Sequence, residues 1–352
     1  MENLNNLNYF LGANTCVGFY SHFDELANNP DDFLWIIKGG PGNGKSGFMK
    51  KIAIAANKAG YAVEFAYCSG DPNSLDGIYF PELKTGYVDG TSPHVADAKI
   101  AACNSAYIDL GAFYDIAKIK PQKDALEHYF TKNKECYERA YAFLKAAGSV
   151  KRISIENSLP DAVKRRINGL SNSNFKKKRN SNAHVKRLFL TAHTCDGITM
   201  FSKTLSTLCN KIQVIDSSLG YAPTALEDLS KSAIAAGFDI IICDDPLIPE
   251  IPEAVIVPKL SLAFINSTSP LSMVEPSKKI RLDIYADNHE LHRKKGENRK
   301  FSKIYNALLN EAYLSLSEAK SNHDELEKIY NPYVNFDGVY ALAEEHLSML
   351  LY

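Results

Sequence analysis

The sequence lacks the marks of a disulfide-bonded, zinc-binding or membrane-spanning protein. Its seven cysteines are dispersed and odd in number, and no two of them stand in a C-x-x-C spacing. That usage is typical of a reducing compartment. No uncharged apolar run approaches the roughly 18 residues that a membrane span needs, and the N-terminus lacks the basic and apolar regions of a signal peptide. The sequence therefore predicts a soluble, cytoplasmic protein.

One segment of the chain contains no acidic residue. The net charge is -1, which gives no overall bias toward nucleic acid or membrane, but residues 164–187 hold nine lysines and arginines and no acidic residue. We expect a solvated linker here, because residues 168–182 are polar and aperiodic. Nucleic-acid binding is the alternative, and it is disfavoured because Phe175 is the only aromatic residue available for base stacking.

The chain contains an internal repeat. Residues 8–26 match residues 187–205 at seven of nineteen positions, and residues 81–93 match residues 258–270 at five of thirteen. The offsets, 179 and 177, are nearly equal, so the two matches are collinear. We therefore predict two copies of one unit. The expected organisation is a first domain over 1–150, a basic polar linker over 151–184 and a second domain over 185–352, with long helices near 122–147, 302–330 and 338–350.

A glycine-rich octet is the most specific motif. Residues 39–46, GGPGNGKS, fit the P-loop pattern G-x-x-x-x-G-K-[ST]. The apolar run FLWIIK precedes the octet as a strand should, and a helical pattern from Ser46 to about Ala59 follows it. The glycines let backbone N–H groups converge on phosphate oxygens, and the helix adds its positive end. The residues expected to hold phosphate are Gly39, Gly40, Pro41, Gly42, Asn43, Gly44, Lys45, Ser46 and Gly47.

The octet predicts the roles of individual side chains. Lys45 is expected to neutralise the β- and γ-phosphates, and Ser46 to hold Mg²⁺. A carboxylate at the end of a neighbouring strand would complete the metal shell, and Asp89, which ends the run KTGYVD, is the candidate. Asp71, which follows the strand AVEFAYC, is a candidate to position water or metal. His94 is a candidate to sense the γ-phosphate or carry a proton. Each of these three also fits a simple loop or turn.

The second copy serves as an internal control on these assignments. The repeat aligns Gly44 with Ala222, Lys45 with Pro223, and Asp89 with Asn266. Proline removes both the ammonium group and a backbone N–H. The lysine and the carboxylate are therefore absent together in one copy and present together in the other. We predict that the second half is a degenerate P-loop domain.

The reaction is less specified than the binding. The first arginine of the chain is Arg139, so a phosphoryl-transfer site in the first half would import its arginines from Arg139, Arg152, Arg165 or Arg166, or from the second half. An arginine finger contributes about 10³ to 10⁵ in rate. We therefore expect a slow ATP hydrolase, or one that is activated by a partner or by the second half. A small-molecule kinase and a non-enzymatic nucleotide switch remain the alternatives.

The first half resembles a poorly characterised bacterial family of tandem P-loop ATPases. The resemblance lies in KGGPGNGKSGFMKKIA, EFAYCSGDPNSLDGIYFPEL and VDGTSPHVAD, and it extends over both halves. It implies an α/β fold with two tandem P-loop NTPase-like domains, each a mostly parallel sheet flanked by helices, that binds ATP with Mg²⁺. Members of this family can carry an intact P-loop in both copies. This chain departs from that pattern at Ser217, Ala222 and Pro223.

Overall fold

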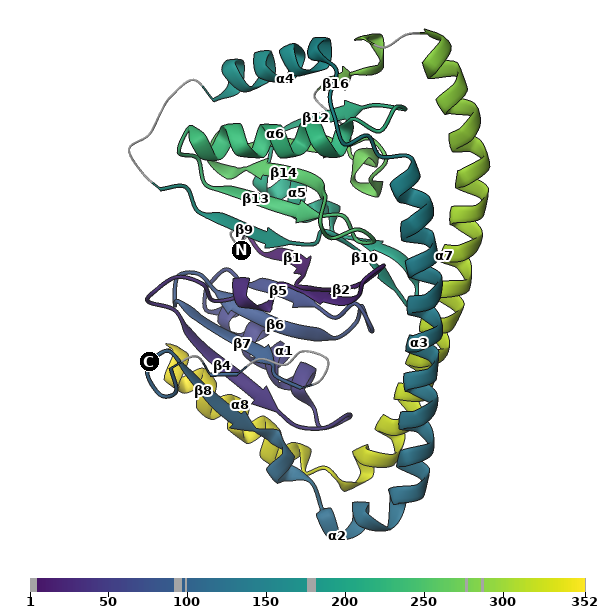
Figure 1. Cartoon of the computed structure of the whole chain (residues 1–352). Helices are drawn as coiled ribbons and strands as arrows, with labels where there is room; N and C mark the ends of the chain where they lie inside the picture. The colour runs from purple at the N-terminus through teal and green to yellow at the C-terminus, as the bar shows by residue number, and fades with distance from the viewer. Residues whose placement is uncertain are drawn as a thin grey trace.

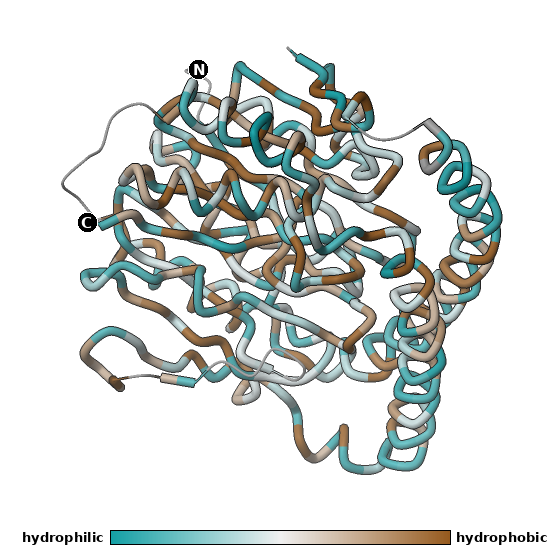
Figure 2. Tube along the Cα trace, turned by 45° about the horizontal axis from the view of Figure 1, so that its top comes forward, coloured by the Kyte–Doolittle hydropathy of each residue, from teal (hydrophilic) through white to brown (hydrophobic). Residues whose placement is uncertain are grey.

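The computed structural model describes residues 5–91, 97–98, 100–175, 182–275, 278–285 and 288–351. It is an α/β protein with two six-stranded mixed sheets flanked by helices (Figure 1). No described helix is both long enough and apolar enough to cross a membrane. Figure 2 shows hydrophobic segments gathered in the strands, while the long outer helices are largely hydrophilic.

The first sheet has the strand order β1-β5-β6-β7-β4-β8. Only β6 runs antiparallel to its neighbours, and the other pairs are parallel. The strands are β1 (Leu7–Phe10), β5 (Glu64–Tyr67), β6 (Leu75–Phe80), β7 (Thr85–Asp89), β4 (Phe33–Lys38) and β8 (Ser105–Asp109). Because five strands share one direction, their carboxyl ends meet at one edge of the sheet, where open α/β sheets bind ligands.

The second sheet repeats this topology strand for strand. Its order is β9-β13-β14-β15-β12-β16, again with one antiparallel strand, β14. The strands are β9 (Val185–Leu188), β13 (Ile240–Asp244), β14 (Pro252–Val257), β15 (Leu262–Asn266), β12 (Lys211–Asp216) and β16 (Lys278–Arg281). Two hairpins also correspond, β2 (Gly12–Thr15) with β3 (Gly18–Ser21), and β10 (Thr191–Thr194) with β11 (Gly197–Met200). The repeat in the sequence is thus a repeat of topology.

The helices that cover the sheets are exchanged between the two sequence halves. The helices α3 (Lys123–Ile153) and α7 (Asn288–Tyr330) lie side by side along one edge of both sheets (Figure 1). After α7, the chain returns to the first sheet, where α8 (Phe336–Leu351) packs on α1 (Lys45–Lys58). After α3, α4 (Asp161–Asn174) packs on α6 (Ala222–Ala235) of the second sheet. Two short helices complete the chain, α2 (Ile116–Ile119) and α5 (Ser202–Leu208).

The exchange shows in the cores. Val339 and Ala343 of α8 are fully buried in one cluster with Phe48 and Met49 of α1. The opposite faces of the two sheets share a core of their own, in which Ile36 of β4 and Ile212 of β12 take part. The first sheet is therefore completed by the last helix of the chain.

The segment expected to be a linker is mostly helical. The helix α3 continues to Ile153, and α4 occupies residues 161–174. Val163, Ile167 and Leu170 are buried against α6, because their spacing of three and four residues puts them on one helical face. The polar composition of residues 168–174 concealed this stripe. Lys186 and Arg187 are paired with Glu64 and Asp244, and residues 176–181 lie outside the described residues.

Candidate functional site

The glycine loop, residues 39–46, joins β4 to α1 at the carboxyl edge of the first sheet. The helix begins at Lys45, and its N-cap, Gly44, has a φ of 86°. Gly42 also has a positive φ, 67°. Residues with a side chain rarely adopt these angles, so the glycines let the backbone curl directly before the helix N-terminus.

Gly39 has a φ of 156° and lies against the side chain of Asn43. A Cβ atom on Gly39 would lie 1.7 Å from Nδ2 of Asn43, so a larger residue here would displace that amide. Asn43 is 1% exposed, and its Nδ2 has no hydrogen-bond partner among the described residues. An unpaired buried donor costs free energy. The loop thus holds a buried N–H₂ group that a ligand could satisfy.

Lys45 and Asp89 come together beside this loop. Nζ of Lys45 donates to the carbonyl oxygen of Gly40 at 2.8 Å and to that of Gly39 at 3.2 Å. It also lies 3.7 Å from Oδ2 of Asp89. Asp89 ends β7, which pairs in parallel with β4 so that Ile37 is opposite Asp89. The other carboxylate oxygen of Asp89 accepts from the backbone N–H of Thr91 at 2.9 Å, which orients it.

Ser46 meets the start of β6. Its Oγ accepts a hydrogen bond from the backbone N–H of Leu75 at 3.0 Å. Asp76 is the second residue of β6, whose sequence LDGIYF is buried throughout, so its Asp-Gly pair makes no turn.

Asp76 occupies a β-bulge that the sequence reading missed. Tyr67 pairs with Leu75 and Ala66 with Gly77, so Asp76 is the extra residue. Gly77 also pairs with Val88, which puts Asp76 and Asp89 at the same end of adjacent strands. Bulges beside functional sites often re-aim a side chain. The second sheet has the same bulge, since Glu253 is the extra residue of β14, between residues that pair with Cys243 and Asp244.

Asp76 is 3% exposed and lies next to Cys68. Burial, with the neighbouring Asp76 carboxylate as a second cause, raises the pKa of the Cys68 thiol well above its usual range. Cys68 is therefore a neutral thiol. The hydroxyl of Ser46 and the carboxylate of Asp89 lie beside the glycine loop, and Asp76 lies at the same end of the sheet.

Asp71 is engaged elsewhere. Its carboxylate accepts from Oγ of Ser74 at 2.9 Å and from the backbone N–H of Asn73 at 3.1 Å. It also lies 3.6 Å from Nζ of Lys320, which α7 contributes. The structure therefore places Asp71 as the cap of its own loop and the partner of a cation from the second half. His94 lies outside the described residues.

Part of the wall around the loop comes from other segments. Oη of Tyr114 donates to the carbonyl oxygen of Pro41 at 2.7 Å. A Cβ atom on Gly42 would meet Asn331 and Glu327 near the end of α7, and one on Gly44 would meet Phe336 of α8. A Cβ atom on Gly47 would lie 3.3 Å from Oη of Tyr340. The second sequence half thus closes over the glycine loop of the first.

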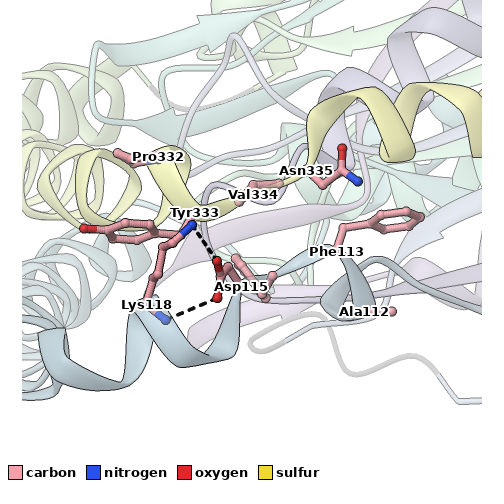
Figure 3. Close-up of a pocket in the computed structure, with 9 residues that line it drawn as sticks. Ala112, Phe113, Asp115, Lys118, Pro332, Tyr333, Val334 and Asn335 are labelled. Carbon is pink, nitrogen blue, oxygen red and sulfur yellow. Dashed lines mark hydrogen bonds and ion pairs between the residues drawn. The ribbon is translucent and has the colours of Figure 1, made fainter.

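A cavity of about 390 Å³ lies between residues 112–118 and 332–335 (Figure 3). Tyr114 connects it to the loop, because the same residue lines the cavity and bonds to Pro41. Asp115 stands within it and pairs with Nζ of Lys118 at 2.8 Å. The remaining wall includes the aromatic residues Phe113 and Tyr333. The arrangement suits a flat ring that carries hydrogen-bond donors.

The corresponding position in the second half is built differently. The backbone N–H of Glu156 donates to the carbonyl oxygen of Gly220 at 3.1 Å, and Oγ1 of Thr224, the counterpart of Ser46, donates to the carbonyl oxygen of Glu156 at 2.7 Å. The carbonyl oxygen of Ser154 lies 1.9 Å from where a Cβ of Gly220 would be. The chain that follows α3 therefore packs directly against the turn that corresponds to the glycine loop.

No family model matches the chain, and neither a curated protein nor a solved structure matches it. The site is therefore interpreted from its own geometry.

Proposed function

We propose that the glycine loop binds the phosphates of a nucleoside triphosphate, ATP first, together with Mg²⁺, and that the chain hydrolyses it slowly. The observation that carries the proposal is the position of Lys45 Nζ, inside the curl of the loop and 3.7 Å from the Asp89 carboxylate. A cation and a metal-binding acid at a helix N-terminus form the arrangement that phosphoryl chemistry needs. Under this proposal the first half is a P-loop domain, and the chain a member of the tandem P-loop ATPases that it resembles.

The residues present fit both groups. The buried Nδ2 of Asn43 and the backbone of three glycines with positive φ supply donors for phosphate oxygens. Ser46 and Asp89 would hold the Mg²⁺, since hydroxyl and carboxylate oxygens are its usual protein ligands. When bound, the metal would neutralise phosphate charge. Asp76 stands at the same end of the sheet, and we assign it the positioning of water in place of Asp71.

The distribution of cations favours slow hydrolysis over phosphoryl transfer to an acceptor. Among the described residues, no arginine hydrogen-bonds or pairs with a residue of the glycine loop. Arg139 pairs with Glu318, and Arg152 pairs with Glu250, both away from the loop. A kinase usually clamps the transferring group between several cations. A kinase remains the alternative if turnover appears only with an acceptor.

A nucleotide-dependent switch is the second candidate, because α7 and α8 touch the glycine loop. A ligand that displaced Asn331 or Glu327 from Gly42 would act directly on the α3–α7 pair.

The cavity beside Tyr114 is assigned to the base, for which its aromatic walls and Asp115 are suited. The seven free thiols suit a reducing cytoplasm. Protein or nucleic-acid partners are not required by the proposal.

The test is calorimetric titration with ATP, GTP and ADP, with and without Mg²⁺, with phosphate release assayed in the same samples. Lys45→Ala is expected to weaken triphosphate binding by roughly 10- to 100-fold, since a charged hydrogen bond contributes about 1.5–3 kcal/mol. Lys51→Ala is the matched control, because Lys51 lies on the same helix and pairs with Glu344. Binding that Lys45→Ala leaves unchanged, or no binding of any nucleotide, refutes the proposal. Binding without release supports the switch.

A further inference from the structure

A second cavity, of about 230 Å³, lies in the second half where the glycine loop lies in the first. Its walls come from residues 217–223, from the end of β15, and from the facing sides of α3 and α7. It thus stands at the carboxyl edge of the second sheet, where the fold places ligands.

Phosphate and metal do not suit this cavity. The carbonyl oxygen of Gly220 and the hydroxyl of Thr224 are both bonded to Glu156. Pro223 has no N–H to offer. Asn266 stands where the first half has the Asp89 carboxylate. Neither the donors nor the acid that would hold a triphosphate remain.

Several polar groups of the lining are nevertheless uncommitted. Nδ2 of Asn266, Oγ1 of Thr268 and Oη of Tyr305 make no hydrogen bond to a described residue, although all three residues line the cavity. Asn266 is only 5% exposed. Its Oδ1 accepts from the backbone N–H of Thr268 at 3.1 Å, which holds the amide in place. The N–H₂ group of Asn266 is thus available to donate to a bound acceptor.

The lining carries no net charge. Lys151 is its only residue charged at neutral pH, and it is paired with the buried Asp245. The rings of Phe301 and Tyr305 contribute flat apolar surface. The volume is below that of most pockets for drug-sized ligands, which is about 300–1,000 Å³. The wall therefore suits a small, flat, uncharged molecule with hydrogen-bonding edges.

We propose that this cavity binds an uncharged purine or pyrimidine base, either free or as its nucleoside, through Asn266, Thr268 and Tyr305. The second half is then a sensor site that discriminates against phosphate, and it works independently of triphosphate binding at the glycine loop. The helix α7 forms part of this wall and also reaches the glycine loop through Glu327, so one helix runs past both sites.

The test is calorimetric titration of the full chain with adenine, guanine, cytosine, uracil and their nucleosides. Thr268→Val and Tyr305→Phe each remove one hydroxyl that makes no hydrogen bond to a described residue, so both variants should fold. Each substitution is expected to raise the Kd of the ligand roughly tenfold, because one hydrogen bond to the ligand is lost. Tyr285→Phe is the matched control outside the lining, and Lys45→Ala should leave this binding unchanged.

Three results would overturn the proposal. One is that no base or nucleoside binds saturably at concentrations up to about 5 mM. A Kd above that concentration corresponds to a binding free energy weaker than about -3 kcal/mol. Another is binding that Lys45→Ala abolishes while Thr268→Val and Tyr305→Phe leave it intact, which would put the base beside the glycine loop. The last is tighter binding of the nucleoside monophosphate than of the nucleoside, which would show that the site accepts phosphate. Thermal unfolding of each variant checks that losses are local.

Discussion

Nζ of Lys45 and Oδ2 of Asp89 lie 3.7 Å apart, although 44 positions separate the two residues in the sequence. The parallel pairing of β4 with β7 brings them together, since Asp89 is opposite Ile37, two residues before the glycine loop. In the second half the same two positions hold Pro223 and Asn266. The pair is therefore a feature of one half only, and it is the natural place to probe function.

Asp89→Asn tests the metal role without disturbing the fold. Asn266 already makes the same turn in the second half, where its Oδ1 accepts from the N–H of Thr268. An amide at residue 89 should therefore keep the bond from Thr91. The Mg²⁺ concentration needed for half-maximal triphosphate binding is expected to rise roughly tenfold or more, because a charged ligand is lost. Asp109→Asn at the end of β8 is the control, and equal Mg²⁺ dependence of both variants contradicts the assignment.

Asp76→Asn and Asp71→Asn separate two candidates for positioning water. Asp76 lies in the bulge beside β7, whereas Asp71 is bound to Ser74, Asn73 and Lys320. Phosphate release is expected to fall about 100-fold in Asp76→Asn, the usual value of a positioned acid or base. In Asp71→Asn the rate of phosphate release should fall by less than about threefold, which is no more than the loss of one hydrogen bond would cause. The reverse order would restore Asp71 to the role that the sequence suggested.

Gly220→Ala should destabilise the second half. Its φ is +79°, and the new Cβ would lie 1.9 Å from the carbonyl oxygen of Ser154, which is backbone and cannot swing away. We expect the free energy of unfolding to fall by about 2–4 kcal/mol. Gly169→Ala is the matched control, since nothing lies within 4 Å of its Cβ position inside α4. That variant should gain about 0.5–1 kcal/mol. Urea unfolding measures both, and equal effects would refute the close contact.

Glu253 makes stability depend on pH. Burial, with Asp245 as a second cause, raises its pKa from 4.5 to about 8. Between these values the folded chain keeps a proton that the unfolded chain has released, so the free energy of unfolding falls as pH rises, and the fall ends above pH 8. Glu253→Gln removes this loss. The free energy of unfolding of the variant should exceed that of the natural chain by about 4–5 kcal/mol at pH 8.5, and the two should converge near pH 4.5.

The control for this prediction is Glu250→Gln, because Glu250 is half-exposed and pairs with Arg152 at the surface. Its effect should stay below about 1 kcal/mol at every pH. If the stability difference between Glu253→Gln and the natural chain does not change with pH, Glu253 ionises normally and the raised pKa is wrong.

Val339→Asp should unfold the first sheet, although residue 339 belongs to the second half of the sequence. Val339 is fully buried against α1, and burying an unpaired carboxylate there would cost several kcal/mol. Trp35 reports the event, because its ring centroid lies 4.5 Å from that of His346 in α8. We expect a red-shifted Trp35 emission at lower urea than in the natural chain. Ala341→Asp, on the exposed side of α8, should change neither the Trp35 emission nor the urea concentration at which the chain unfolds. Identical urea unfolding curves for the two variants would contradict the exchange of helices.

The repeat and the glycine loop could be predicted from the sequence, and both for local reasons. Matching segments at nearly equal offsets predicted two copies, and the two sheets share one strand order. The loop was recognisable because its glycines, Lys45 and the flanking strand and helix are contiguous. The sheets are mixed, however, because one strand in each, β6 and β14, runs antiparallel to both of its neighbours.

Which partners complete the site was decided by the tertiary structure alone. Asp76 gains its position from a bulge, which is a property of pairing between β5 and β6 and not of either strand. The wall from Asn331 and Phe336 depends on α7 returning across both sheets, and Tyr114 joins it from the segment after β8. Sequence determined which residues could bind phosphate, since that chemistry resides in consecutive residues. Packing determined which half covers these residues. The apolar face of α8 is buried on the first sheet, and that of α4 is buried on the second.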